Sequence, residues 1–283
     1  MNIAPLVIDP IRQMHPESIG QAPRHGRLAG RRILVVGAGQ RDIPEAQPPL
    51  GNGRAVSVLF AREGASVACI DLSAEAVRST VGQIESEGGK AIGEVGDVRD
   101  AASIAPLLRH CADRMGGLDG LVLNVGISHG LPLAELTAAS WDEEYAVNVR
   151  SHMLFSQAAL EVMPPGSSIV LMASLAALRN SSGNPAYESS KAAQVSLARA
   201  IAMAGQAKGI RCNSVLPGLM DTPMGRDATR RRPGRAVAVP FARQGTAWEV
   251  AYACLFLISN EASYVNAHAL QVDGGLATGI TRA

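Results

Sequence analysis

The sequence contains little charge, few aromatic side chains and no long apolar run. Charged residues make up 18% of the chain and the formal net charge is only +1, which excludes a strong electrostatic attraction to nucleic acid or to an anionic membrane. No apolar run approaches the roughly 20 residues that a membrane-crossing helix needs. The short apolar stretch at 3–8 has neither a basic lead nor a cleavage site, so it does not read as a secretory signal. We therefore expect a soluble, cytoplasmic protein without a nucleic-acid or membrane partner.

Cysteine is also scarce, and its spacing excludes a disulfide framework or a paired-cysteine metal site. The four cysteines, Cys69, Cys111, Cys212 and Cys254, form no C-x-x-C pair. We interpret them as buried thiols in a reducing cytoplasm, and we expect no metal. The sequence has instead 47% apolar residues and 29 glycines among 283 residues, which is typical of a globular α/β protein.

Apolar runs of strand length alternate with helical patterns along almost the whole chain. This alternation predicts a parallel sheet with helices on both faces. No linker or repeat divides it, so we expect a single doubly wound α/β domain at 31–283, preceded by an arm at 1–30 that is either loose or draped over a neighbour. The expected strands are 32–36, 66–70, 91–95, 120–124, 169–173, 211–215 and 269–272, and the expected helices are 55–63, 73–87, 101–115, 137–163, 187–208 and 247–259.

Glycines cluster in two groups after the first expected strand. In a doubly wound sheet this turn holds a dinucleotide pyrophosphate, because glycines let the backbone approach and a helix N-terminus offers free N–H groups. Ten residues, 41–50, separate the groups, and removing them leaves the compact turn G-A-G-Q-G-N-G-R-A. We therefore interpret 41–50 as an insertion, and hypothesise that it lies at the rim of the cofactor cleft and partly covers the cofactor. The turn residues are Gly37, Gly39, Gln40, Gly51, Asn52 and Gly53.

Asp71 ends the second expected strand, where a carboxylate can serve as a selector of the cofactor. It can accept hydrogen bonds from the adenosine ribose hydroxyls, and it repels a 2′-phosphate. This position favours NAD over NADP. The alternative is that Asp71 is an ordinary turn residue.

A serine, a tyrosine and a lysine supply the chemistry. Tyr187 and Lys191 are four residues apart, so on a helix they share one face. A nearby cation lowers the pKa of a phenol, ordinarily about 10, towards the working range of an acid or base. Ser174 directly follows the apolar run 169–173. Together the three can hold a carbonyl oxygen and pass it a proton, but none can supply a hydride, so a cofactor is required. Y-x-x-x-K alone is common by chance.

Taken in order, these residues resemble a classical short-chain dehydrogenase/reductase, over about 31–276. The resemblance also rests on Asp97-Val98, Leu123-Asn-Val-Gly126, Asn148 and Pro217-Gly218. It implies a Rossmann-type fold, with Tyr187 as acid/base, Ser174 orienting the substrate oxygen and Lys191 binding the nicotinamide ribose. It further implies that Asn148 holds a water in a proton relay to that lysine. The implied cofactor contacts are Gly37, Gly39, Gln40, Gly51, Asn52, Gly53, Asp71, Leu72, Asp97, Val98, Asn124, Val125, Gly126, Tyr187, Lys191, Pro217, Gly218 and Thr222.

The chain departs from the family pattern at Val36, where a threonine is usual, and at Leu123 and Val125 within the N-N-A-G strand end. The resemblance implies a homotetramer formed through the two long helices that flank the 169–173 strand. Both helices carry small residues that suit close packing: Ala158, Ala159, Ala192, Ala193, Ala198 and Ala200.

The function predicted is NAD(H)-dependent hydride transfer between the nicotinamide and a secondary alcohol or ketone. A 3-oxoacyl thioester and a small cyclic or xenobiotic ketone both stay open as substrates, and a non-catalytic dinucleotide-binding sensor is the alternative of another class. The segment 219–241 is expected to close over the substrate. Its arginines at 226–235 read either as a solvated loop or as a contact for an acidic group, and His129 either lines the pocket or lies on the surface without a role.

Overall fold

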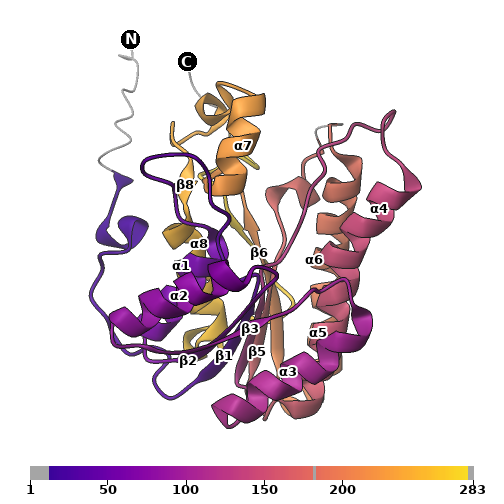
Figure 1. The fold of residues 1–283 in the computed structure, drawn as a ribbon. Coiled ribbons are helices and arrows are strands. Elements are labelled where there is room, and N and C mark those ends of the chain that lie inside the picture. Colours follow the sequence, from indigo (N-terminus) through magenta and orange to yellow (C-terminus); the bar gives the residue numbers. More distant parts are fainter. Residues whose placement is uncertain (1–12, 181–182, 280–283) are drawn as a thin grey trace.

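A single sheet of parallel strands forms the centre of the molecule (Figure 1). The computed structural model describes residues 13–180 and 183–279, except for the side chains of 236 and 237. The sheet has seven strands in the order β3-β2-β1-β4-β5-β6-β9. These are β1 (Arg32–Val36), β2 (Ser66–Asp71), β3 (Lys90–Val95), β4 (Gly120–Leu123), β5 (Ser168–Met172), β6 (Arg211–Pro217) and β9 (Ala269–Val272).

Helices cover both faces of this sheet, which confirms the predicted doubly wound α/β fold (Figure 1). Successive residues of β1 point to opposite faces, so Ile33 and Val35 join one apolar core and Leu34 and Val36 the other. Because both faces are buried, the strands read as continuous apolar runs. One face carries α1 (Asn52–Arg62), α2 (Ala74–Ser86) and α8 (Ala247–Ile258); the other carries α3 (Ala101–Met115), α5 (Ser151–Val162) and α6 (Pro185–Gly205). The four cysteines are buried free thiols, as predicted.

The strand order reverses its direction of winding between β1 and β4. In open α/β sheets ligands bind at such a switch point, outside the carboxyl ends of the strands. The turn after β1 and the loop after β4 are neighbours here, since Val36 pairs with Leu123. The candidate site is therefore expected at this edge.

One expected helix, 137–163, is not continuous in the structure. It consists of α4 (Ala138–Tyr145), a five-residue π-helix (Ala146–Arg150) and α5. A π-turn is rare and is often found at a functional site. Beyond β6 the chain also forms β7 (Met220–Asp221), α7 (Pro223–Arg231) and β8 (Gly245–Thr246). Thr222 caps α7 by accepting a hydrogen bond from the Gly225 amide at 3.1 Å.

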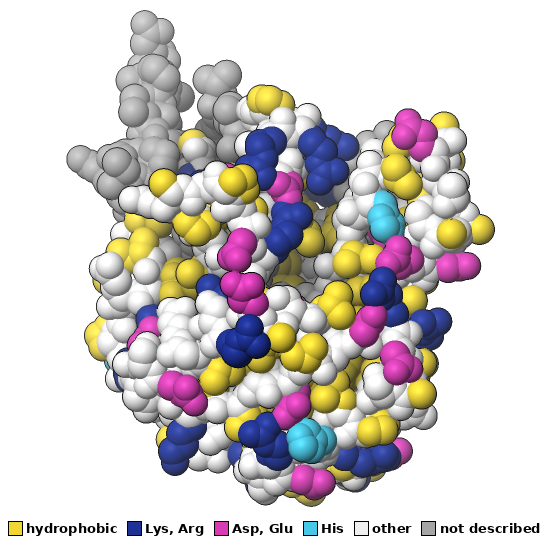
Figure 2. Space-filling view, in the orientation of Figure 1, with side chains coloured by type: hydrophobic (Ala, Val, Ile, Leu, Met, Phe, Trp, Pro, Cys, Tyr) yellow, Lys and Arg dark blue, Asp and Glu magenta, His cyan; other side chains and the backbone are white. Residues whose placement is uncertain are grey.

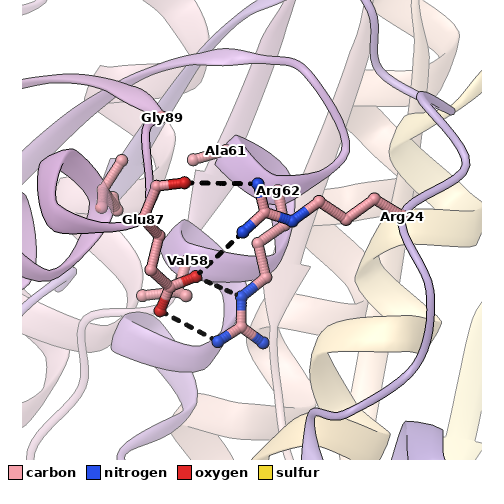
Figure 3. A pocket seen from close by; sticks show the side chains of 7 residues that line it. Arg24, Val58, Ala61, Arg62, Glu87 and Gly89 are labelled. Carbon is pink, nitrogen blue, oxygen red and sulfur yellow. Dashed lines mark hydrogen bonds and ion pairs between the residues drawn. The ribbon is translucent and has the colours of Figure 1, made fainter.

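Residues 13–30 lie against α1 and α8 of the same chain. The Ser18 hydroxyl donates to Glu249 at 3.0 Å, and Arg62 donates to the Gly20 carbonyl at 2.7 Å. Figure 3 shows Arg24 and Arg62 both directed at Glu87, which Arg62 binds through two bonds of 2.6 and 2.9 Å. The shallow pocket around them lies where α1 and α2 end, at the amino edge of the sheet, and ion pairs fill it.

Candidate active site

Tyr187, Lys191 and Ser174 meet at the carboxyl edge of the sheet. Ser174 follows β5 and caps the one-turn 3₁₀ helix Leu175–Ala177, its Oγ accepting from the Ala176 amide at 3.1 Å. Tyr187 and Lys191 lie in the first turns of α6, and the Lys191 Nζ is 5.5 Å from the centre of the Tyr187 ring. That Nζ donates to the main-chain oxygen of Met172 at 2.9 Å. The end of β5 therefore positions both the serine and the lysine.

Burial dominates the electrostatics of this pair. Lys191 is only 3% exposed, and burial lowers its pKa to about 7. Burial also raises the pKa of the Tyr187 phenol, while a hydrogen bond with Ser174 acts in the opposite direction. The expected lowering of the Tyr187 pKa by Lys191 is therefore not what the structure gives, because desolvation of the phenolate is the larger effect. Among the described residues, Arg235 contributes a positive charge that favours the phenolate.

Asn148 lies in the π-helix, where its side chain holds the loop after β4. Its Oδ1 accepts from the Ile127 amide and its Nδ2 donates to the Ile127 carbonyl, both at 2.9 Å. The Nδ2 also donates to the Ser190 hydroxyl on α6 at 3.0 Å. Asn148 is fully buried, so it fixes the loop, the π-turn and α6 relative to one another.

Two buried polar residues next to Asn148 were missed by the sequence analysis. Gln194 donates through Nε2 to the Asn148 main-chain oxygen at 2.7 Å and to His152 Nδ1 at 2.9 Å. Burial lowers the pKa of His152 to about 3, so the ring is neutral and its Nε2–H donates to the Val125 carbonyl at 3.0 Å. The available signal was position: His152 is four residues after Asn148 and Gln194 three after Lys191, hence on the same helix faces.

The two glycine groups come together as one turn. The Gln40 Oε1 accepts from the Gly51 amide at 2.9 Å and so closes the base of the 41–50 loop. Gly37 has φ +80°, and a β-carbon at Gly53 would collide with the Gly37 carbonyl oxygen. Helix α1 begins at Asn52 without any side-chain cap, so its first N–H groups are free for an anion. This cradle fits a pyrophosphate.

The two acidic candidates differ in their surroundings. The Asp71 Oδ2 accepts from the Gly39 amide at 2.8 Å, so this carboxylate lies directly against the glycine turn. Asp97 instead forms an ion pair with Arg99 at 2.7 Å, which lowers the pKa of Asp97. Its neighbour Val98 is buried, whereas Leu72 is 60% exposed.

The 41–50 loop reaches across to α7. Glu45 forms ion pairs with Arg226 and with Arg230, the latter at 2.9 Å, and Arg41 pairs with Asp227. Reading the arginines of 226–235 as a solvated loop was therefore wrong for Arg226 and Arg230, which lie on a helix with acidic partners. Figure 2 shows this face hollowed between the basic side chains over α7 and the side that carries α4.

The loop after β4 forms the opposite wall. Gly126 is held so close to the lysine that a β-carbon there would lie 3.1 Å from the Lys191 Nζ. His129 is about one-third exposed, and its ring lies 3.3 Å from Glu143. Its amide donates to the Glu144 Oε1 at 2.7 Å. Glu144 is fully buried and was not singled out from the sequence.

The remaining predicted contacts surround the ends of β4 and β6. Asn124 donates through Nδ2 to the Gly37 carbonyl at 2.7 Å, which joins the two central loops. Pro217 ends β6, and the Gly218 amide donates to the Val272 carbonyl at 2.9 Å. The contacts of these residues with a cofactor stay predictions. Within 13–180 and 183–279 no cluster of three or more potential ligands suits a metal, and no helix is long and apolar enough to cross a membrane.

The chain is similar in sequence and structure to known oxidoreductases over most of its length. A family whose model is described as enoyl-(acyl carrier protein) reductase matches residues 50–277. The 3-oxoacyl-[acyl-carrier-protein] reductase FabG of Thermotoga maritima is 32% identical, with 88% of this chain and 99% of the relative covered. Sorbitol dehydrogenase of Cereibacter sphaeroides is also 32% identical, over 88% and 98%. A mutant short-chain dehydrogenase/reductase of Serratia marcescens superposes with a TM-score of 0.82 at 30% identity, covering 89% of this chain and 100% of that one.

Proposed function

Because this chain belongs to the short-chain dehydrogenase/reductase family, we propose that it transfers hydride between NAD(H) and a secondary alcohol or ketone. The observation that carries the proposal is the pairing of Tyr187 with the buried Lys191, with Ser174 beside them, at the switch point that also holds the glycine turn. A non-catalytic sensor would need the glycine turn but not a proton donor.

Each side chain has a distinct role in the reduction of a ketone. When bound, the nicotinamide cofactor supplies the hydride. Tyr187 gives its phenolic proton to the oxygen that becomes the alcohol, and Ser174 donates a hydrogen bond to the same oxygen. Lys191 would bind the nicotinamide ribose and stabilise the resulting phenolate. In oxidation the phenolate removes the hydroxyl proton. Tyr187 then returns to its starting state by exchanging this proton with solvent through Lys191 and a water that Asn148 would hold.

The preference for NAD over NADP is proposed from Asp71. Its carboxylate lies 2.8 Å from the Gly39 amide, which puts a negative charge beside the turn that would hold the adenosine half. A ribose hydroxyl can donate to this carboxylate, whereas a 2′-phosphate would be repelled. Loop 41–50 would cover part of the bound cofactor, since Glu45 ties it to α7 across the hollow.

Titration with NADH and with NADPH, followed by turnover of an alcohol and ketone panel, tests the proposal. We expect NADH to bind more tightly, and Tyr187→Phe to keep NADH binding while losing most turnover, by about 10²-fold or more. Tyr264→Phe is the control, because Tyr264 is fully exposed and precedes the amino end of β9, whereas the site lies at the carboxyl edge of the sheet. Full turnover in Tyr187→Phe contradicts the acid/base role, and preference for NADPH contradicts the role of Asp71.

A second candidate function, reduction of a 3-oxoacyl thioester or another anionic ketone, is favoured by Arg235. This guanidinium is partly buried and interacts with Tyr187, and no acidic partner accompanies it within 13–180 and 183–279. Arg231 lies close to Gly130 on the opposite wall. A guanidinium beside Tyr187 that has no acidic partner among the described residues would attract a negatively charged substrate.

The comparison of a keto acid with its methyl ester tests this candidate. Arg235→Gln is expected to raise KM for the keto acid about tenfold and to leave the ester unchanged, since only the acid loses a charged partner. Arg109→Gln is the control, because Arg109 is paired with Glu161 on the exposed surface of α3 and α5. Equal effects on acid and ester would leave the neutral ketone as the substrate class.

The assembly is proposed to be a homotetramer through α4–α5 and α6. Only some of the small residues expected at that interface are exposed and so available to contact a second copy. Ala158, Ala159 and Ala198 are buried in the chain's own core, whereas Ala192 and Ala200 are exposed. The outward faces of α5 and α6 also expose Met153 and Met203, at 40% and 51%. Light scattering on the purified protein would give the mass of the assembly.

A further inference from the structure

A fully buried carboxylate lies behind the catalytic pair. Glu144, on α4, has a relative exposure of 0%. Its Oε1 accepts from the His129 amide at 2.7 Å, while its Oε2 is buried and has no hydrogen-bond partner within the described ranges. A carboxylate is seldom buried without a cationic or hydrogen-bonding partner for each oxygen. A structural role as the anchor of the His129 loop would account for only one of the two oxygens.

The cation that can offset this charge is Lys191. Its ammonium is buried as well, and the one hydrogen bond it makes among the described residues goes to the neutral Met172 carbonyl. No carboxylate in 13–180 or 183–279 lies within 4.0 Å of it as an ion pair. A β-carbon at Gly126 would lie 3.1 Å from the Lys191 Nζ and 3.3 Å from the Asn148 Oδ1, so the lysine and Asn148 converge on one point. Glu144 lies four residues before Asn148, and its helix α4 packs against α6. The charge of Glu144 is expected to act on Lys191 and Tyr187 across this contact.

We propose that Glu144 is a positioning residue that acts as the buried counter-ion of Lys191 and so sets the protonation of the Lys191–Tyr187 pair. The effect of Glu144 on catalysis rests on the proposed function. The interaction between the charges of Glu144 and Lys191 does not depend on that function.

The other charges near Glu144 do not replace it. His129 faces it from the loop after β4, and Glu143, its neighbour on α4, is directed at the His129 ring and at Arg99. On α6, the groups whose charge interacts with that of Glu144 are Lys191 and Tyr187. Arg235, in the segment after α7, interacts with Tyr187. Among the described residues, Glu144 raises the pKa of Lys191 against the burial that lowers it. Burial raises the pKa of Glu144 itself, while the His129 amide and the charges of His129 and Lys191 act to lower it.

The sign of the effect follows from Coulomb's law. A negative charge favours the ammonium over the neutral amine, and it disfavours the phenolate. Glu144→Gln keeps an oxygen for the His129 amide but removes the charge. The pKa of Lys191 and that of Tyr187 should therefore both fall in this variant.

Lysine-selective ¹³C labelling makes the first of these shifts directly observable. The chain has three lysines, Lys90, Lys191 and Lys208, and Lys90 and Lys208 are exposed and serve as internal references. In an NMR titration without cofactor, Glu144→Gln should lower the pKa of Lys191 by about one unit or more. Glu143→Gln, which removes the adjacent exposed charge, should leave Lys191 within a few tenths of wild type. An unchanged Lys191 in Glu144→Gln, or equal shifts in the two variants, overturns the proposal.

Activity provides a second readout that a merely structural role would not move. In alcohol oxidation the acidic limb of the kcat profile should shift to lower pH in Glu144→Gln, while Glu144→Asp, which retains the charge, should stay near wild type. If Glu144→Gln does not fold, Glu144→Met, similar in shape and without a charge, makes the same prediction for Lys191. A wild type without any turnover, or an active Tyr187→Phe, would refute the proposed function yet leave the lysine titration to decide the counter-ion.

Discussion

Loop 41–50 should contribute measurably to cofactor affinity through its ion pairs with α7. Glu45 is the residue to change, because it bonds both Arg226 and Arg230. Glu45→Gln keeps the size of the side chain and removes its charge. If the loop closes over the cofactor, as proposed, weakening the closed position must weaken binding.

The magnitude follows from the exposure of the pairs. The side chains of Glu45, Arg226 and Arg230 are 24%, 35% and 52% exposed, so solvent screens both interactions. Pairs of this kind contribute about 0.5 kcal/mol each. Together they amount to about 1 kcal/mol, which corresponds to a roughly fivefold rise in Kd.

Quenching or enhancement of nicotinamide fluorescence gives the NADH Kd at low salt and at 1 M NaCl. We expect the fivefold difference at low salt and a smaller one at 1 M, where the Debye length is about 3 Å. Glu161→Gln is the matched control, since Glu161 pairs with Arg109 at 2.7 Å on the exposed surface of α3 and α5. Wild-type NADH affinity in Glu45→Gln at low salt, or a loss of affinity that does not depend on salt, would refute the proposed role of these ion pairs in closing loop 41–50 over the cofactor.

Three further changes probe the site. Gly53→Ala should abolish NADH binding and, in urea unfolding, lower the free energy of unfolding by about 1–3 kcal/mol, because the added methyl group meets the Gly37 carbonyl. Gly82→Ala on α2 is the control. A β-carbon there meets nothing within 4 Å, so this variant should be neutral or stabilising. Gln194→Leu should cost about 1–3 kcal/mol in urea unfolding, since it removes the donor to Asn148 and His152, and an unchanged midpoint would contradict that network. Asp71→Ala should lower the ratio of NADPH to NADH dissociation constants by about tenfold, and a constant ratio would leave Asp71 as a turn residue.

The local spacing of residues was enough to predict the fold and much of the site. The alternation of apolar runs and helical patterns predicted the strands to within one or two residues at most ends, for example 32–36 and 269–272. Such patterns succeed because the sheet is buried on both faces and each strand must be apolar throughout. The predicted proximity of Ser174, Tyr187 and Lys191 follows from the same logic, since it needs only a strand end and one helix face.

Helix interruptions and paired charges were beyond this reasoning. The π-turn at 146–150 has no mark in a helical pattern, because a single wider turn leaves the apolar spacing nearly intact. The arginines of α7 read as solvated because their partners, Glu45 and Asp221, come from other segments or from a short strand. The expected net lowering of the Tyr187 pKa was wrong, because burial of the phenol raises that pKa.

The sequence by itself determined the order of the chemistry along the chain: two glycine groups, an acid after the second strand, a serine, and a tyrosine four residues before a lysine. Each of these features depends on residues close together in the chain, and the repeat of side-chain directions along a strand or helix is enough to predict which of them share a face. Only the tertiary structure determined which charged groups are buried away from solvent. Glu144 looks like any helix-surface acid until α4 packs against α6, and in the folded chain its side chain is fully buried. Desolvation depends on the atoms that surround a group, and those come from distant parts of the sequence.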